Sequence, residues 1–203
     1  MARSSNDPHS KIVGEGLTFD DLLLLPRFSN FKRADVDLTT RLHKNVTLKL
    51  PVLSSPMDTV TELPMGIAMA QHGGLGVIHR NLSVAEQAAM VRGVKETAAK
   101  DTNVAATDNA GRLLTAAAVG AGADLEERVR ALLDAEADVI VVDSGHGHSQ
   151  FILEGVKLIK KLKKDQVVMA GNVATAEGAD ALIKAGADIL RVGIGPGSIC
   201  TTR

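Results

Sequence analysis

Aromatic residues are almost missing from this 203-residue chain, at 2%, with four Phe and no Trp or Tyr. Proteins that bind single-stranded nucleic acids stack bases on exposed aromatic rings, so this composition disfavours that class of function. The net charge of −1 also predicts no general attraction to nucleic acids or anionic membranes. The core must rest on aliphatic residues, and 203 residues suffice for one domain with such a core.

The chain has a single cysteine, Cys200. One cysteine cannot form an internal disulfide, which predicts a reducing, cytoplasmic environment. The first ten residues lack the apolar centre of a signal peptide, and residues 1–13 are expected to be a flexible leader. No apolar run approaches the roughly 20 residues of a membrane span, so no membrane partner is expected.

Short apolar runs alternate along the chain with longer segments of helical periodicity. The runs are too short for helices and several are β-branched, which is typical of buried parallel strands. Strands are therefore predicted at 52–54, 75–78, 116–119, 139–142, 167–170 and 189–192. Ser83 and Glu86 form a predicted capping box, and Asp124 begins a similar pattern. Helices are predicted at 83–96, from about 124 onwards, at 150–164 and at 176–185.

An internal repeat favours a barrel over a doubly wound sheet. Residues 132–143 resemble residues 182–193, and Gly-x-Gly follows each copy. We expect an α/β fold, a TIM (β/α)8 barrel with about six of its eight βα units in this chain. In such barrels the chemistry gathers at the C-terminal ends of the strands. The distinctive residues of this chain follow predicted strands, at 54–58, 79–81, 143–148, 171–172 and 193–203.

The last of these segments combines glycines with the cysteine. Gly193, Gly195 and Gly197 allow a ligand to approach the backbone closely, and Cys200 follows them. Cysteine in such a loop is a candidate nucleophile. The alternative is a small buried apolar residue, the usual role of a lone cysteine. Residues 97–111, by contrast, are small and polar, as in a surface connection or an engineered junction.

Five stretches carry recognisable motifs: residues 16–26, 53–62, 73–81, 170–177 and 193–203. They resemble the family of inosine 5′-monophosphate (IMP) dehydrogenase and its relative guanosine 5′-monophosphate (GMP) reductase. The segment 143–149, Asp-Ser-Gly-His-Gly-His-Ser, resembles the dehydrogenase more than the reductase. The resemblance implies a catalytic barrel over residues 14–203, incomplete at its C-terminal end. The family usually inserts two cystathionine-β-synthase-like (CBS) modules, and here the short linker 97–111 holds that place.

The activity implied by the resemblance is NAD-dependent oxidation of IMP to xanthosine 5′-monophosphate (XMP), in guanine nucleotide biosynthesis. Cys200 would attack purine C2, because the flat aromatic ring cannot release hydride until that carbon is tetrahedral. A covalent thioimidate would remain for water to hydrolyse. Thr202 would lie near the reacting base. The chain alone is expected to be incomplete for turnover.

The resemblance also implies three groups of binding residues. Substrate binding falls to Ser55, Met57, Asn172 and Ser198. Cofactor binding falls to Asp143, Ser144, Arg191, Gly193 and Gly195, with the Asp143 carboxylate on the nicotinamide ribose. Potassium would be held by backbone carbonyls of Gly195, Gly197 and Cys200.

The sequence leaves several alternatives open. Met57 could instead pack in the core. His79 could approach the cofactor or cap the end of its strand. His146 and His148 suggest a metal, but no third ligand has the spacing of a zinc site. The family resemblance suggests a homotetramer. GMP reductase, or an inactive nucleotide-binding fragment, is the alternative function.

Overall fold

The computed structural model of the protein describes residues 21–195, which fall into two units. One unit comprises residues 37–194, and the other includes residues 21–36 and Gly195. The stretch 21–36 is exposed throughout and contains the 3-10 helix η2 (Arg33–Asp35). All further elements described below belong to the first unit.

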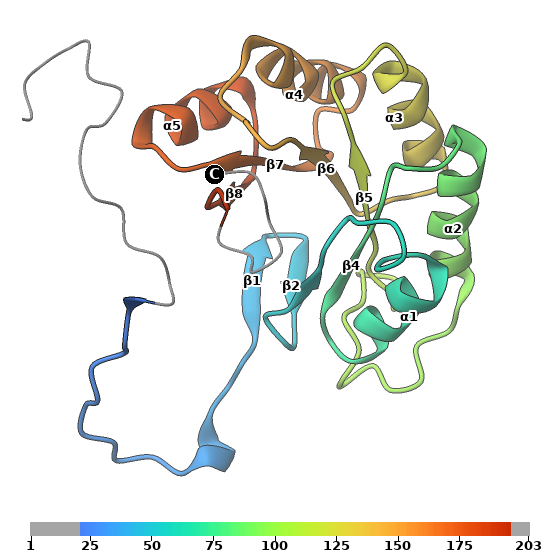
Figure 1. Ribbon diagram of the computed structural model, residues 1–203. Helices are drawn as coiled ribbons and strands as arrows, with labels where there is room; N and C mark the ends of the chain where they lie inside the picture. Colours follow the sequence, from blue (N-terminus) through green and yellow to red (C-terminus); the bar gives the residue numbers. More distant parts are fainter. Residues whose placement is uncertain (1–20, 196–203) are drawn as a thin grey trace, which may run out of the picture. The chain divides into compact units, whose positions relative to one another are not determined.

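Six parallel strands form one sheet whose spatial order follows the sequence. They are β3 (Leu53–Ser54), β4 (Leu75–Ile78), β5 (Ala116–Val119), β6 (Val139–Asp143), β7 (Val167–Val173) and β8 (Ile189–Val192). Helices follow five of the strands: α1 (Leu63–Gln71), α2 (Val84–Glu96), α3 (Leu125–Asp134), α4 (Gln150–Leu162) and α5 (Ala176–Ala185). The sheet curls into a half-barrel with the helices along its outer side (Figure 1). This confirms the predicted (β/α) barrel with six units.

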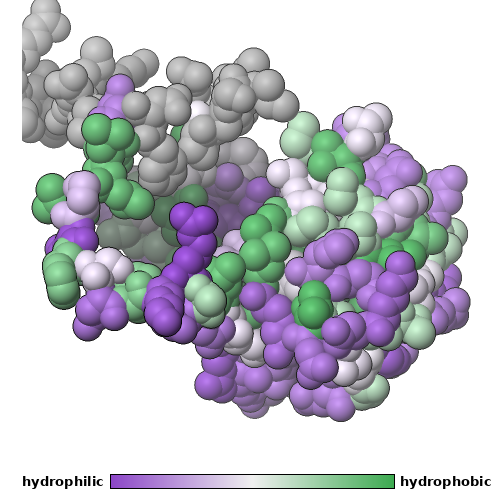
Figure 2. Space-filling model, turned by 90° about the horizontal axis from the view of Figure 1, so that it is seen from below, coloured by the Kyte–Doolittle hydropathy of each residue, from purple (hydrophilic) through white to green (hydrophobic). Residues whose placement is uncertain are grey.

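Alternate residues of the strands enter two different apolar clusters. In β6, Ile140 and Val142 face the cluster shared with the helices, whereas Val139 and Val141 face the inside of the half-barrel. Both faces of the strand are therefore covered, which explains why it reads as a continuous apolar run. The outer surface is mainly hydrophilic with isolated hydrophobic residues over the right-hand part of Figure 2.

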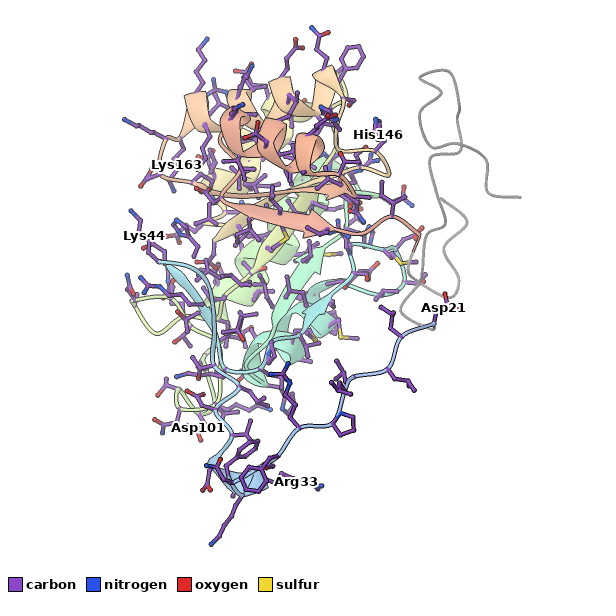
Figure 3. All side chains as sticks on the ribbon, turned by 90° about the vertical axis from the view of Figure 1, so that its left-hand side faces the viewer. Asp21, Arg33, Lys44, Asp101, His146 and Lys163 are labelled. Carbon is purple, nitrogen blue, oxygen red and sulfur yellow. The ribbon has the colours of Figure 1, made fainter. Side chains whose placement is uncertain are left out.

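A β-hairpin that the sequence did not predict closes the inside of the half-barrel. Its antiparallel strands are β1 (Thr40–His43) and β2 (Val46–Leu48), and Val46 and Leu48 are buried in the inner cluster. Lys44, at the hairpin turn, and Lys163, just before β7, lie on one side of this unit, while His146, after β6, lies on the other (Figure 3). The hairpin thus lies toward the N-terminal ends of the strands and leaves the C-terminal ends accessible.

The predicted helix starts are confirmed, but one of the two predicted caps is not. At α2, Glu86 N donates to Ser83 Oγ at 3.2 Å and Ser83 N donates to Glu86 Oε2 at 3.0 Å, which completes the capping box. At α3, Asp124 forms no side-chain cap; its Oδ2 instead accepts from Arg128 Nε at 2.8 Å. Helix α1 was not predicted.

The linker 97–111 is more than a surface connection. Ala105 and Ala106 are completely buried, and Ala106 N donates to Ala70 O at the end of α1 at 2.8 Å. An antiparallel bridge between Thr107 and Leu113 then leads into β5. Small residues suit this segment because it packs closely against the barrel, a property that its polar composition concealed.

A buried ion cluster joins this linker to the barrel. Lys95 Nζ donates to Asp108 Oδ2 at 2.8 Å and to both oxygens of Asp138 at 3.0 Å. Burial raises the pKa of Asp138, and the opposing Lys95 charge does not fully offset it. At Asp108 burial is also the largest single effect, but hydrogen bonds from Lys95 and the backbone together lower the pKa. The end of α2, the linker and the start of β6 are thereby linked.

Replacing Gly76 by alanine is expected to lower the free energy of unfolding by about 1–3 kcal/mol, as overpacking does. An added Cβ would lie 2.6 Å from Gly66 Cα, so α1 and β4 would have to separate. Urea denaturation measures the loss. Gly122→Ala is the control, because its added Cβ meets only a side-chain oxygen, at 3.3 Å. Equal stability of the two variants would show that the α1–β4 contact yields without strain.

Candidate functional site

A polar cavity of about 370 Å³ lies at the C-terminal ends of β3, β4 and β6. Its lining residues are Pro56, Met57, Asp58, His79, Arg80, Asn81 and Asp143. The cavity therefore brings Met57, predicted to bind substrate, and Asp143, predicted to bind cofactor, to one space. Met57 is 44% exposed, which favours its predicted place in a binding pocket over packing in the core.

A buried threonine holds the loop that follows β3. Thr61 is completely buried, and its Oγ1 donates to Ser55 O at 2.6 Å and lies 2.9 Å from Ser54 Oγ. Met57 N donates to the same Ser55 carbonyl at 2.8 Å. These two hydrogen bonds hold the Ser55 carbonyl, and the residue itself is exposed.

His79 lines the cavity but is almost completely buried, directly after the end of β4. It is 2% exposed, and its Nδ1 accepts from Asn81 N at 3.1 Å. Its Nε2 lies 3.4 Å from Glu62 Oε1. Because Nδ1 accepts, the neutral ring carries its proton on Nε2, facing the carboxylate. The imidazole thus fixes the turn after β4.

Asp143 and Arg191 form an ion pair that crosses β7. Asp143 is aligned with Gly171 in β7, and Gly171 is aligned with Arg191 in β8. A Cβ at Gly171 would lie 2.7 Å from Arg191 Cβ, so only glycine leaves room for the arginine there. Arg191 Nη1 donates to Asp143 Oδ1, and about 30% of each side chain is exposed. A ligand can therefore reach both groups.

Hydrogen bonds to backbone carbonyls bring the other predicted residues to this pair. Asn172 N donates to Ser144 O at 2.7 Å, and Asn172 Nδ2 donates to Gly193 O at 2.9 Å. Gly193 and Gly195 have φ values of 117° and 69°, a conformation that favours glycine. One cluster at the C-terminal ends of β6, β7 and β8 therefore contains Asp143, Ser144, Asn172, Arg191 and Gly193.

Four predicted site residues, Gly197, Ser198, Cys200 and Thr202, lie outside the described residues. His146 and His148 are exposed in the loop after β6. Within residues 21–195, no group of three or more histidine and acidic side chains could hold a metal ion. In the same part of the chain, no helix combines the length and hydrophobicity needed to cross a bilayer.

Asp58, Arg80 and Asn81 line the cavity but were not predicted as site residues. Asn81 Nδ2 donates to Asp58 Oδ2 at 3.0 Å, which connects the loops after β3 and β4. All three lie in the segments 54–58 and 79–81, which are distinctive in the sequence because they follow short apolar strands. Their shared cavity depends on the curvature of the sheet, which the sequence pattern alone does not specify.

The sequence profile of the family described as "IMP dehydrogenase / GMP reductase domain" matches residues 16–203. The chain belongs to this family. Among its relatives are proteins named inosine-5′-monophosphate dehydrogenase from Cryptosporidium parvum, 44% identical, and from Borreliella burgdorferi, 41% identical. Another, from Aquifex aeolicus, is 34% identical. The alignments include 95–96% of this chain but only 55–63% of the relatives.

Membership in the IMP dehydrogenase / GMP reductase family agrees with the half-barrel and with the cluster at its C-terminal strand ends. The alignment to the Aquifex relative extends over 307 positions, whereas this chain has 203 residues, so that relative carries additional sequence inside the aligned region. IMP dehydrogenases are NAD-dependent oxidoreductases. In this chain the partly exposed ion pair of Asp143 and Arg191 lies at the C-terminal strand ends.

Proposed function

We propose that the chain supplies the nucleophile and much of the nucleotide site for NAD-dependent oxidation of IMP to XMP. The observation that carries the proposal is the cluster of Asp143, Asn172, Arg191 and Gly193. In the sequence, Arg191 and Gly193 come just before the segment that bears Cys200. A cavity connects this cluster to Met57 in the loop after β3. Polar groups thus converge at the barrel end where the chemistry of such folds takes place.

In the proposed reaction the Cys200 thiolate adds to purine C2 of IMP, forming the S–C2 bond and making C2 tetrahedral. C2 then loses its hydrogen with the bonding electron pair as hydride, which NAD accepts. The resulting thioimidate adds water at C2, the thiolate leaves, and XMP is released. The balance is IMP, NAD⁺ and water to XMP, NADH and a proton. Thr202 lies near the reacting base in this assignment.

The described residues have separate binding roles. IMP is held by Ser55, Met57, Asn172 and Ser198. The Asp143 carboxylate accepts from the ribose hydroxyls of the cofactor, and its ion pair with Arg191 orients it. Ser144, Gly193 and Gly195 complete the cofactor side. The support for Ser144 and Gly193 is that Ser144 N donates to Gly171 O at 3.0 Å and Gly193 N donates to Val173 O at 2.8 Å, which fixes both residues beside Asp143.

Further parts of the proposal rest on the family resemblance. Carbonyls of Gly195, Gly197 and Cys200 bind potassium, a hard cation that prefers oxygen ligands. The catalytic unit, residues 14–203, works in a homotetramer in the cytoplasm. The linker 97–111 holds the place where CBS modules are inserted in relatives.

Two alternatives predict different measurements. A GMP reductase would oxidise NADPH in the presence of GMP, and a nucleotide-binding fragment would bind IMP without any turnover. We expect NADH formation from IMP and NAD when residues 1–203 are joined to the part of the Borreliella relative that follows the counterpart of Arg203. Residues 1–203 alone are expected to show no turnover. A joined protein that folds but oxidises NADPH with GMP instead would contradict the dehydrogenase assignment.

Replacing Asp143 by alanine is expected to raise the KM for NAD about tenfold or more, since a charge-assisted hydrogen bond is lost. The KM for IMP should change little. Steady-state kinetics of the joined protein measure both constants. Asp134→Ala is the control, because Asp134 is exposed at the end of α3, away from the strand ends that carry the site. A selective rise in the KM for IMP would assign Asp143 to the substrate.

A further inference from the structure

Arg80 is an exposed cation that lines the cavity containing Asp143. Its side chain is exposed, and within residues 21–195 it makes no ion pair and no side-chain hydrogen bond. The carboxylate of Asp124 already accepts a hydrogen bond from Arg128 Nε at 2.8 Å. That hydrogen bond is the main cause of the lowered pKa of Asp124, and the charge of Arg80 lowers this pKa least. The positive charge of Arg80 is therefore available to a ligand.

The surrounding residues position this guanidinium rather than neutralise it. Gly120 lies directly against it, since a Cβ at Gly120 would be 3.2 Å from Arg80 Cζ and Nη1. On either side in the sequence, the buried His79 accepts from Asn81 N, and Asn81 donates to Asp58. The turn is thus fixed, and the acidic Asp58 already has a partner.

The cavity therefore presents two complementary groups. Asp143 offers a half-exposed carboxylate that can accept hydrogen bonds from hydroxyls, and Arg80 offers donors and positive charge for an anion. A ribose 5′-phosphate carries vicinal hydroxyls and a phosphate on one small ring. Guanidinium groups bind phosphate through paired N–H donors, so this arrangement matches such a ligand.

We propose that Arg80 binds the phosphate attached to the nicotinamide ribose of the dinucleotide cofactor. This inference rests on the proposed function, which places the ribose at Asp143. The shared chemistry is a nucleotide phosphate, and the IMP phosphate is the competing source. Arg80 then contributes to cofactor affinity and takes no part in the chemical step.

The test compares ligands that differ by that phosphate. Nicotinamide mononucleotide, nicotinamide riboside and IMP are titrated separately by calorimetry into residues 1–203 and into the variants Arg80→Ala and Arg80→Lys. We expect Arg80→Ala to weaken mononucleotide binding about tenfold, the size of one charge-assisted hydrogen bond, and to leave riboside binding unchanged. Arg80→Lys should retain part of the affinity. Arg92→Ala, at an exposed position on α2, is the control and should change nothing.

The outcomes separate this inference from the proposed function. If Arg80→Ala leaves mononucleotide binding unchanged, or weakens the riboside equally, the phosphate contact is wrong while the function stands. If it weakens IMP binding instead, the phosphate belongs to the substrate and the cofactor assignment is overturned. If residues 1–203 bind neither nicotinamide ligand at millimolar concentration, this inference fails, whereas the function is decided separately by NADH formation in the joined protein. Thermal unfolding of each variant shows whether it is folded.

Discussion

Replacing Cys200 by alanine is expected to abolish NADH formation, with a loss of about a thousandfold or more, because no other group in the proposal can make C2 tetrahedral. The measurement is absorbance at 340 nm with IMP and NAD, in the protein that joins residues 1–203 to the C-terminal remainder of the Borreliella relative. IMP affinity should stay within about threefold of the parent, since the thiol contributes to the reaction more than to ground-state binding.

A serine variant provides the matched comparison. Cys200→Ser retains a hydroxyl of similar size, but a hydroxyl is a far weaker nucleophile than a thiolate at neutral pH. It should therefore be nearly as inactive as the alanine variant. An equal burst of NADH from the parent and either variant would remove Cys200 from the mechanism and would leave the cavity at Asp143 without an assigned nucleophile.

Replacing Lys95 by methionine is expected to lower the free energy of unfolding by about 3 kcal/mol or more, the usual effect of removing one partner from a buried ion pair. Methionine preserves most of the side-chain volume, so the loss reports charge rather than packing. Only 4% of the Lys95 side chain is exposed, and its partners Asp108 and Asp138 are 14% and 15% exposed. Two largely buried carboxylates would lose their counter-charge.

The stability lost in Lys95→Met should also depend on pH. Burial already raises the pKa of Asp138, and without Lys95 the pKa of both carboxyls should rise. A folded state with a raised carboxyl pKa gains stability as the pH falls toward that pKa. The loss in Lys95→Met should therefore be largest at neutral pH and smaller in mildly acidic solution.

Urea denaturation at several pH values measures the effect. Lys184→Met is the control, because Lys184 and its partner Asp180 are both largely exposed and such pairs contribute about 0–1 kcal/mol. Asp138→Asn combined with Lys95→Met should cost less than the sum of the two single changes, since they belong to one cluster. Additive losses, or a loss in Lys95→Met that does not vary with pH, would contradict the account of this cluster.

The parallel strands and their helices were predictable because their residue periodicities are strong and local. Residues 139–142 form an apolar run that only a strand covered on both faces would bury, and Ser83 with Glu86 carries its capping signal in the sequence itself. Helix α1 lacks such signals, since it has few polar residues and packs through Gly66. The β1–β2 hairpin is short, and burial of Val46 and Leu48 depends on a surface formed by distant strands.

The candidate site was predictable in its location more than in its contacts. The resemblance placed Asp143 and Arg191 on the cofactor side, and the rule for strand ends placed them at the same rim. Their ion pair depends on the register of three strands and on the missing side chain of Gly171, which no local pattern reveals. The same applies to Thr61, whose buried hydroxyl holds the loop of Ser55.

The most direct test of the central claim is the mass of the peptide that contains Cys200 after acid quenching of the joined protein during turnover. With IMP and NAD together, we expect this peptide to gain the mass of one purine nucleotide joined through sulfur. With IMP alone, or in Cys200→Ala, no such adduct should accumulate. NADH formation without any adduct at Cys200, or an adduct on another residue, would contradict the proposed covalent mechanism.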